Sequence, residues 1–66
     1  MKTLELMVLS ELHNRGYDLN TEMTTITDVV EYIESANEGA TPSTVYTPED
    51  WVIDTASNYP EYLVRR

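Results

Sequence analysis

The stretch TITDVVEYIESANEG, residues 25–39, decides the fold of this chain because it separates apolar from acidic residues at helical spacing. At about 100° per residue, the apolar residues fall in one arc of a helix and the carboxylates in the opposite arc. The pattern predicts a helix over residues 26–38 that builds a core with one face and presents acids on the other. The apolar arc holds Ile26, Val29, Val30, Ile33 and Ala36, and the acidic arc holds Asp28, Glu31, Glu34 and Glu38.

The segment before this stretch also has a helical pattern. Leu4, Val8 and Leu12 recur at i, i+4 and i+8, and Gly16 is placed to end a helix over residues 3–15. Further apolar residues widen this face, and a helix that is apolar on several sides needs more than one neighbour. We therefore expect the central helix of a bundle, or else part of a dimer interface. The additional apolar residues are Leu6, Met7 and Leu9.

The sequence Thr-Pro-Glu-Asp at residues 47–50 is the clearest local signal of a helix start. Thr47 can cap the helix, proline suits the first helical position, and Asp50 can reach back as a variant of the capping box. The helix is expected to run over residues 48–58, where Val52, Ile53 and Ala56 share a face, and to end at the Tyr-Pro step that follows.

The rest of the chain shows no period-two alternation long enough to predict a strand. Residues 16–24 are expected to form a loop in which Met23 closes the core. The predicted fold is therefore all-α, with three helices over about 3–15, 26–38 and 48–58 and a short C-terminal turn. Residues 1–66 are expected to form a single acidic helical domain, since one small core is all that this length supports.

Charge is the strongest compositional feature. Twelve acidic residues oppose four basic ones, for a net charge of −8. No Lys or Arg lies between Arg15 and Arg65, although every acid except Glu5 and Glu11 does. Such a surface repels phosphate backbones and anionic headgroups and attracts basic protein surfaces. Direct binding to nucleic acid or membranes is therefore not expected, and a basic protein partner is; solubility alone is the competing explanation.

The same inventory gives no signature of catalysis or cofactor binding. His13 is the single histidine, and its helix neighbours Ser10 and Glu11 cannot face it as a relay requires. Cysteine is absent, and the carboxylates lack the Asp-rich, Gly-containing loop of a calcium site. We expect no catalytic residue, metal or cofactor. With no long apolar run and an N-terminus unlike a secretory signal, we expect a cytoplasmic location.

The first half of the chain contains three motifs in a recognisable order: Thr3-Leu4-Glu5-Leu6, then Gly16-Tyr17-Asp18-Leu19, then MTTITDVVEYI over residues 23–33. From Thr3 to Ile33 this order resembles the C-terminal half of acyl carrier proteins, in which an acidic helix leads through a loop to a Thr-initiated last helix. That family attaches phosphopantetheine to a serine just before the acidic helix, and no serine takes that place here. The resemblance implies a helical scaffold with an acidic recognition helix and no prosthetic group.

These patterns favour a non-enzymatic acidic binding or inhibitor protein that covers a basic surface of a protein partner. Nucleic-acid mimicry, as in small phage-encoded anti-defence proteins, is one way to do so. The alternatives are a degenerate acyl-carrier-like or docking domain and a structural homodimer through the first helix. Trp51 is either a core residue or an interface anchor. The expected partner-binding residues are Asp28, Glu31, Glu34, Glu38, Glu49, Asp50, Trp51 and Asp54.

Overall fold

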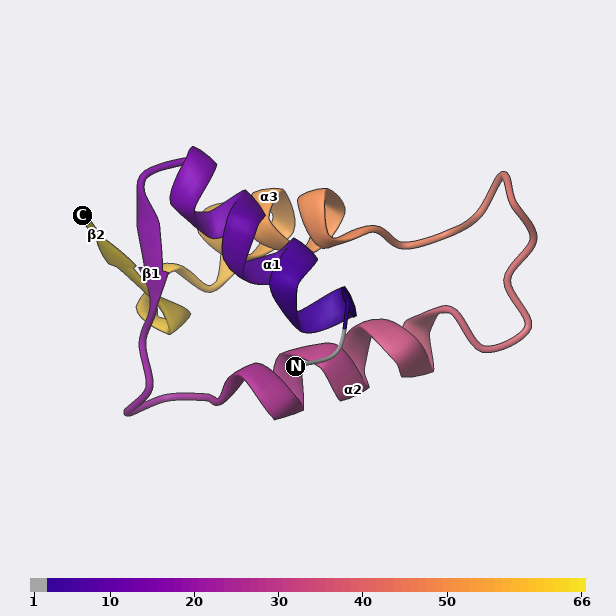
Figure 1. The fold of residues 1–66 in the computed structure, drawn as a ribbon, viewed down its shortest axis with the longest axis horizontal. Helices are drawn as coiled ribbons and strands as arrows, with labels where there is room; N and C mark the ends of the chain where they lie inside the picture. Colours follow the sequence, from indigo (N-terminus) through magenta and orange to yellow (C-terminus); the bar gives the residue numbers. More distant parts are fainter. Residues whose placement is uncertain (1–2) are drawn as a thin grey trace.

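The computed structural model describes residues 3–66 and shows a mainly helical fold built around its first helix (Figure 1). Helix α1 contacts α2, α3 and the first strand, so it is the central helix that its apolar pattern predicted. The helix bounds agree with the predicted ranges to within two residues. The elements are α1 (Thr3–Asn14), β1 (Tyr17–Leu19), α2 (Ile26–Ala36), α3 (Pro48–Asn58), the 3-10 turn η1 (Pro60–Tyr62) and β2 (Leu63–Arg65).

The core forms where α2 and α3 pack against α1. Val8 and Leu12 of α1 are 0% and 2% exposed, and Ile33 of α2 and Val52 of α3 are both 0% exposed. The remaining buried members of this cluster are Val29, Trp51 and Leu63. The apolar arc of α2 is therefore confirmed at its centre, but Ala36, at the last turn of the helix, is exposed and does not join the core.

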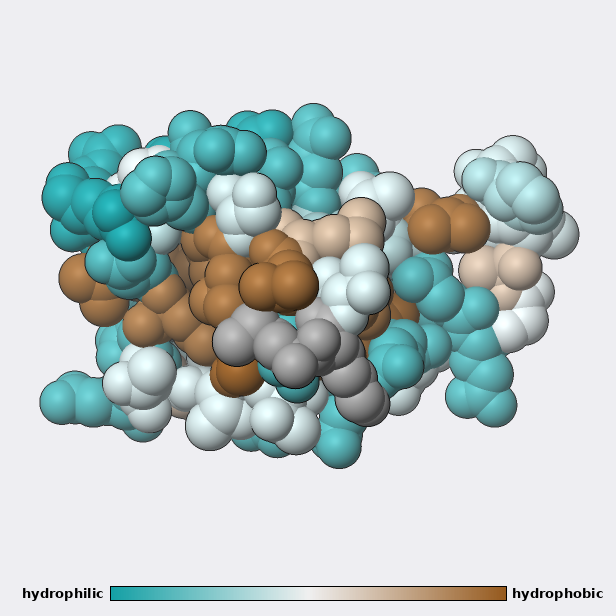
Figure 2. All heavy atoms as spheres, in the orientation of Figure 1, coloured by the Kyte–Doolittle hydropathy of each residue, from teal (hydrophilic) through white to brown (hydrophobic). Residues whose placement is uncertain are grey.

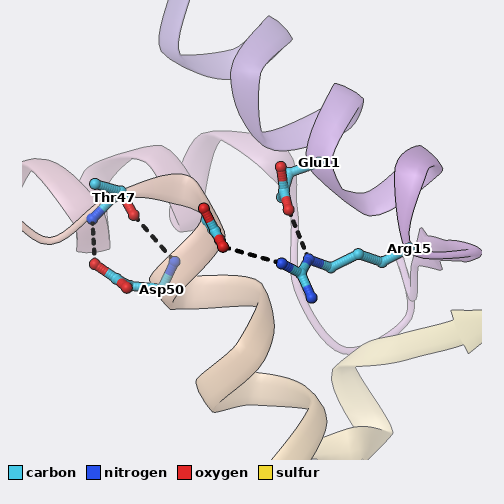
Figure 3. Close-up of polar contacts among 5 residues, drawn as sticks. Glu11, Arg15, Thr47 and Asp50 are labelled. Atoms are coloured by element: carbon cyan, nitrogen blue, oxygen red, sulfur yellow. Dashed lines mark hydrogen bonds and ion pairs between the residues drawn. The ribbon is translucent and has the colours of Figure 1, made fainter.

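Local signals at the helix ends were predicted correctly. The Thr47 hydroxyl accepts a hydrogen bond from the backbone N–H of Asp50, and the Asp50 carboxylate accepts one from the Thr47 N–H, each at 3.1 Å (Figure 3). Thr25 caps α2, because its hydroxyl accepts a hydrogen bond from the Asp28 N–H at 3.2 Å. Gly16 follows α1 with φ +81°, a conformation that favours glycine.

A two-stranded antiparallel sheet corrects the all-α prediction. Strand β1 pairs with β2 in the register Tyr17↔Arg65, Asp18↔Val64 and Leu19↔Leu63. Each strand has three residues, too few to show an alternating pattern, and the two pair across most of the chain. The predicted loop after Gly16 therefore begins with a strand, and the predicted C-terminal turn is the 3-10 turn η1 followed by β2.

Two predictions about individual apolar residues are wrong. Met23 is 51% exposed and does not close the core. Ile53 is 45% exposed, because α3 turns Trp51, Val52 and Thr55 inward instead. No helix within residues 3–66 combines the length and the hydropathy that crossing a bilayer requires.

The pairing of β2 with the core leads to a prediction about two adjacent residues. Leu63 is 8% exposed and belongs to the core, whereas Val64 on the opposite face of the same strand is 47% exposed. We expect Leu63→Ala to lower the free energy of unfolding in urea by about 2–3 kcal/mol, because it leaves a cavity in the core. The matched variant Val64→Ala should cost less than about 1 kcal/mol. Equal losses in the two variants would contradict the observed register.

Candidate protein-interaction site

The acidic face of α2 lies on the side of the helix away from α1. Asp28, Glu31 and Glu34 are exposed, and so is Glu38 just beyond the last turn. Within residues 3–66, no Arg, Lys or His nitrogen lies within ion-pair distance of these four carboxylates. The structure therefore places all four predicted residues of this group on one exposed and unneutralised surface.

The second group of predicted acidic residues, Glu49, Asp50 and Asp54 of α3, is divided by its local contacts. Arg15 donates to Glu11 at 2.6 Å and to Glu49 at 3.2 Å, which ties the end of α1 to the start of α3 (Figure 3). The hydrogen bond that Arg15 donates to Glu11 raises the pKa of the guanidinium. Asp50 is occupied by the capping box. Glu49 and Asp50 therefore make contacts that stabilise the fold, and these contacts limit their direct use by a partner.

Trp51 takes the core position that was one of its two predicted roles. Its side chain is only 6% exposed and packs within the buried cluster. An interface anchor must project from the surface into a pocket of the partner, and a residue this buried does not. Trp51 nevertheless forms part of the lining of a cavity, described next.

A cavity of about 400 Å³ opens between α2 and α3, and aromatic residues dominate its lining. Every Tyr and Trp of the chain except Tyr17 contributes to it. Tyr32 and Tyr46 meet edge to face with ring centroids 6.0 Å apart, and Tyr59 and Tyr62 stack at the same separation. Residues that are dispersed in the sequence therefore form one aromatic surface. We call it the aromatic pocket, and its aromatic members are Tyr32, Tyr46, Trp51, Tyr59 and Tyr62.

Two carboxylates from different helices also line the aromatic pocket. Asp28 comes from α2 and Asp54 from α3, so one residue of each predicted acidic group reaches the same cavity. Asp54 Oδ1 accepts a hydrogen bond from Asn58 Nδ2 at 2.7 Å, and the Asp28 carboxylate accepts none from residues 3–66. No Lys or Arg within residues 3–66 lines this pocket.

Tyr46 is held at the pocket by hydrogen bonds of its backbone, and its hydroxyl is buried. Asn37, which caps the end of α2, donates to the Tyr46 carbonyl at 2.8 Å and accepts from the Tyr46 N–H. The Tyr46 hydroxyl is buried and has no hydrogen-bond partner among residues 3–66. Burial raises the pKa of Tyr46 to about 12, and the nearby Asp54 carboxylate adds to the shift.

The arginines gather at the opposite end of the molecule from the loop that joins α2 to α3. Arg15 follows α1, Arg65 stands opposite Tyr17 in the sheet, and the Arg66 N–H donates to the Gly16 carbonyl at 2.9 Å. The Arg66 side chain also pairs with Asp18 at 2.9 Å. Because the described cations lie near the sheet, the charge of the chain is unevenly distributed and α2 forms a negative side.

An exposed apolar patch lies on α1. Leu6, Met7 and Leu9 are 54%, 50% and 37% exposed, and Figure 2 shows apolar atoms gathered over this helix at the centre of the visible face. These residues are the ones that widened the apolar surface of α1 in the sequence. They are not covered by α2 or α3, which pack on the ridge formed by Leu4, Val8 and Leu12.

The structure brings together no constellation for catalysis among the residues it describes. His13 is exposed, and the neighbouring Glu11 is engaged by Arg15. Within residues 3–66, no group of three or more His, Asp or Glu side chains is arranged to hold a metal ion. Comparisons with protein-family models, curated proteins and solved structures found no match. The likeness to acyl carrier proteins and the absence of enzymatic activity therefore stay predictions.

The unpartnered hydroxyl of Tyr46 gives a prediction about stability. We expect Tyr46→Phe to raise the free energy of unfolding at pH 7 by about 1 kcal/mol, because it removes a buried polar group that makes no hydrogen bond. Urea unfolding measures this, and Tyr59→Phe, which removes a hydroxyl from a 53% exposed side chain, is the matched control. The control should change stability by less than about 0.5 kcal/mol. A clear loss of stability in Tyr46→Phe would contradict the assignment.

The raised pKa of Tyr46 makes the free energy of unfolding depend on pH. The unfolded chain releases this proton near pH 10.0, whereas the folded chain holds it to about 12. The unfolded state therefore binds fewer protons in this window, and the free energy of unfolding falls as the pH rises from about 10 to 12. We expect the fall to be smaller in Tyr46→Phe than in the wild type, measured by urea unfolding across that range. Identical pH profiles would show that another group is responsible.

Proposed function

We propose that this chain is a non-enzymatic acidic protein that binds and covers a basic surface on a protein partner in the cytoplasm. The observation that supports this most is the exposed row of carboxylates on α2, which has no neutralising cation within residues 3–66. A negative surface of this kind accelerates the encounter with a positive one and fixes its orientation. The mechanism is steric and electrostatic, with no bond made or broken.

The spacing of the carboxylates supports nucleic-acid mimicry as the form of this binding. Asp28, Glu31 and Glu34 recur every three residues, which corresponds to about 4.5 Å along the helix axis. Along the axis of a DNA duplex, the phosphates of one strand recur about every 3.4 Å. A groove built to bind DNA would therefore meet charges of the same sign at a comparable axial interval. The partner in this proposal is a DNA- or RNA-binding protein, and the comparison with phage anti-defence inhibitors is an analogy of size and charge.

The acidic residues divide by role in this proposal. Glu49 and Asp50 are engaged by Arg15 and by the α3 cap, so they contribute negative potential rather than direct contacts. Glu31, Glu34 and Glu38 are the direct contacts on the outer face of α2. Asp28 and Asp54 act at the aromatic pocket.

Reversing two charges on α2 tests the proposal. The wild-type chain serves as bait in a low-salt lysate of its source cells, and the captured protein is identified by mass spectrometry and purified. We expect the combined substitutions Glu31→Lys and Glu34→Lys to weaken its binding by at least tenfold, because they replace attraction by repulsion at the contact face. We also expect the wild-type affinity to fall as sodium chloride is raised.

The control for this experiment is Glu22→Lys, an exposed acid in the turn before α2. It should change the affinity by less than threefold, and circular dichroism should show that all variants remain folded. Unchanged affinity in the α2 double variant would remove the acidic face as the contact surface. Capture of enzymes of acyl-chain assembly would favour the carrier-like alternative, which uses the same helix.

The apolar patch on α1 supports a second candidate function, a homodimer through this helix. Leu6, Met7 and Leu9 are exposed apolar side chains that lie close together on one helix. Contiguous exposed apolar patches often mark protein–protein interfaces. If two copies pair there, sedimentation should show a dimer that resists salt and that Leu6→Lys dissociates. The matched variant Ile53→Lys, on an exposed apolar residue of α3, should leave the dimer intact. A monomer at high micromolar concentration would exclude this candidate.

A further inference from the structure

The aromatic pocket is a built cavity to which the proposed function assigns no ligand. It lies between α2 and α3, and its aromatic members come from both helices, the loop between them and the turn after α3. Its volume of about 400 Å³ falls in the range of sites that enclose a small ligand or a long side chain. The Asn37 side chain holds the Tyr46 backbone through two hydrogen bonds, so this wall is fixed before any ligand arrives.

The chemistry of the lining selects for a cation. Aromatic faces attract positive charge through their quadrupole. Asp28 and Asp54 add two carboxylates, and no Lys or Arg of the described part of the chain lines the cavity. An anion or a phosphate-bearing ligand is repelled by the same groups and by the net charge of −8. A neutral apolar ligand would make no favourable contact with the two carboxylates.

We propose that the aromatic pocket accepts an arginine side chain from the basic partner, an inference that rests on the proposed function. A guanidinium is planar and stacks on tyrosine rings, whereas an ammonium group offers no flat face. Its N–H donors also form a rigid fork, so one group can donate toward Asp28 on one helix and Asp54 on the other. Its weaker hydration makes removal from water less costly than for lysine. The outer carboxylates of α2 attract the partner, and the pocket then selects one residue on it.

A peptide titration on the full chain tests this directly. The probe is acetyl-Gly-Arg-Gly-amide, compared with the same peptide containing lysine, trimethyl-lysine or the neutral arginine analogue citrulline. Binding is followed by two-dimensional NMR, which locates the site at the ring signals of Tyr32, Tyr46 and Tyr59. We expect a Kd of about 1 mM for the arginine peptide, because a single side chain makes all of its contacts. The citrulline peptide should bind at least tenfold more weakly. Lysine and trimethyl-lysine should bind at least threefold more weakly than arginine.

Variants separate the pocket from general attraction to an acidic protein. Asp54→Asn and Asp28→Asn should each weaken the arginine peptide by at least fivefold. Glu34→Gln, which removes one negative charge from α2 outside the pocket, should weaken it by less than twofold. Tyr32→Leu keeps an apolar side chain on the exposed side of α2 but removes the ring, and should weaken binding by at least threefold.

Each opposite outcome overturns the assignment. Equal binding of arginine and citrulline peptides, or equal losses in Asp54→Asn and Glu34→Gln, would show that no specific cation pocket exists. Tighter binding of lysine or trimethyl-lysine would show that the pocket does not select a guanidinium. These results are independent of the partner experiment: salt-sensitive partner binding without arginine binding refutes the pocket alone. Arginine binding without any effect of the α2 charge reversal refutes the outer acidic face alone.

Discussion

The burial of α1 from two sides is the constraint on which the rest of the structure depends. A chain of 66 residues without cysteine has one small core and no disulfide to support it. Val8 and Leu12 are buried only because α2, α3 and β1 all contact α1. The antiparallel sheet brings Leu63 into the same cluster and secures the C-terminus against the end of α1. Removing any one of these neighbours would expose the centre of the core.

The aromatic pocket follows from the same arrangement. Because α2 and α3 both pack mainly on α1, their other sides diverge and leave a space that side chains have to line. Tyrosine suits this position, since its ring contributes apolar contact while its hydroxyl tolerates water or a polar neighbour. Trp51 connects the two regions, because it packs in the core and also lines the pocket. The site is therefore a direct consequence of how the core is closed.

The sequence predicted the parts of this structure that local interactions determine. The start of the helix at residue 26 and the capping box at Thr47 both depend on residues a few positions apart, and the structure confirms them. The sheet and the aromatic pocket depend on residues far apart in the chain, such as Tyr17 with Arg65 or Tyr32 with Tyr62. Strands of three residues show no pattern of their own, and scattered tyrosines do not indicate which of them will meet. The inward side of α3 was also misjudged, because its apolar spacing fits two adjacent faces and the packing of Trp51 on the core selects one of them.

The acidic residues differ in whether they stabilise the fold. Asp18, Glu11 and Glu49 are paired with arginines, and Asp50 caps a helix, so each of these contributes to the fold. In α2, Asp28 suits the positive end of the helix dipole, but the carboxylates of this helix repel one another. Asp28 with Glu31 and Glu31 with Glu34 are like charges at i, i+3, which cost a helix about 0.2–0.5 kcal/mol per pair.

The end of α2 adds to this cost. Glu34 lies in the last turn and Glu38 just beyond it, where the helix dipole favours positive charge, and the last turn contains no basic residue. The free energy of unfolding of a domain of this size is only about 3–5 kcal/mol. Unfavourable charges at several neighbouring positions therefore remove a substantial fraction of it. A basic surface placed against α2 would remove the repulsion between the carboxylates and the conflict with the dipole at the same time. Binding of such a partner to the folded state would therefore stabilise the fold as well as the complex.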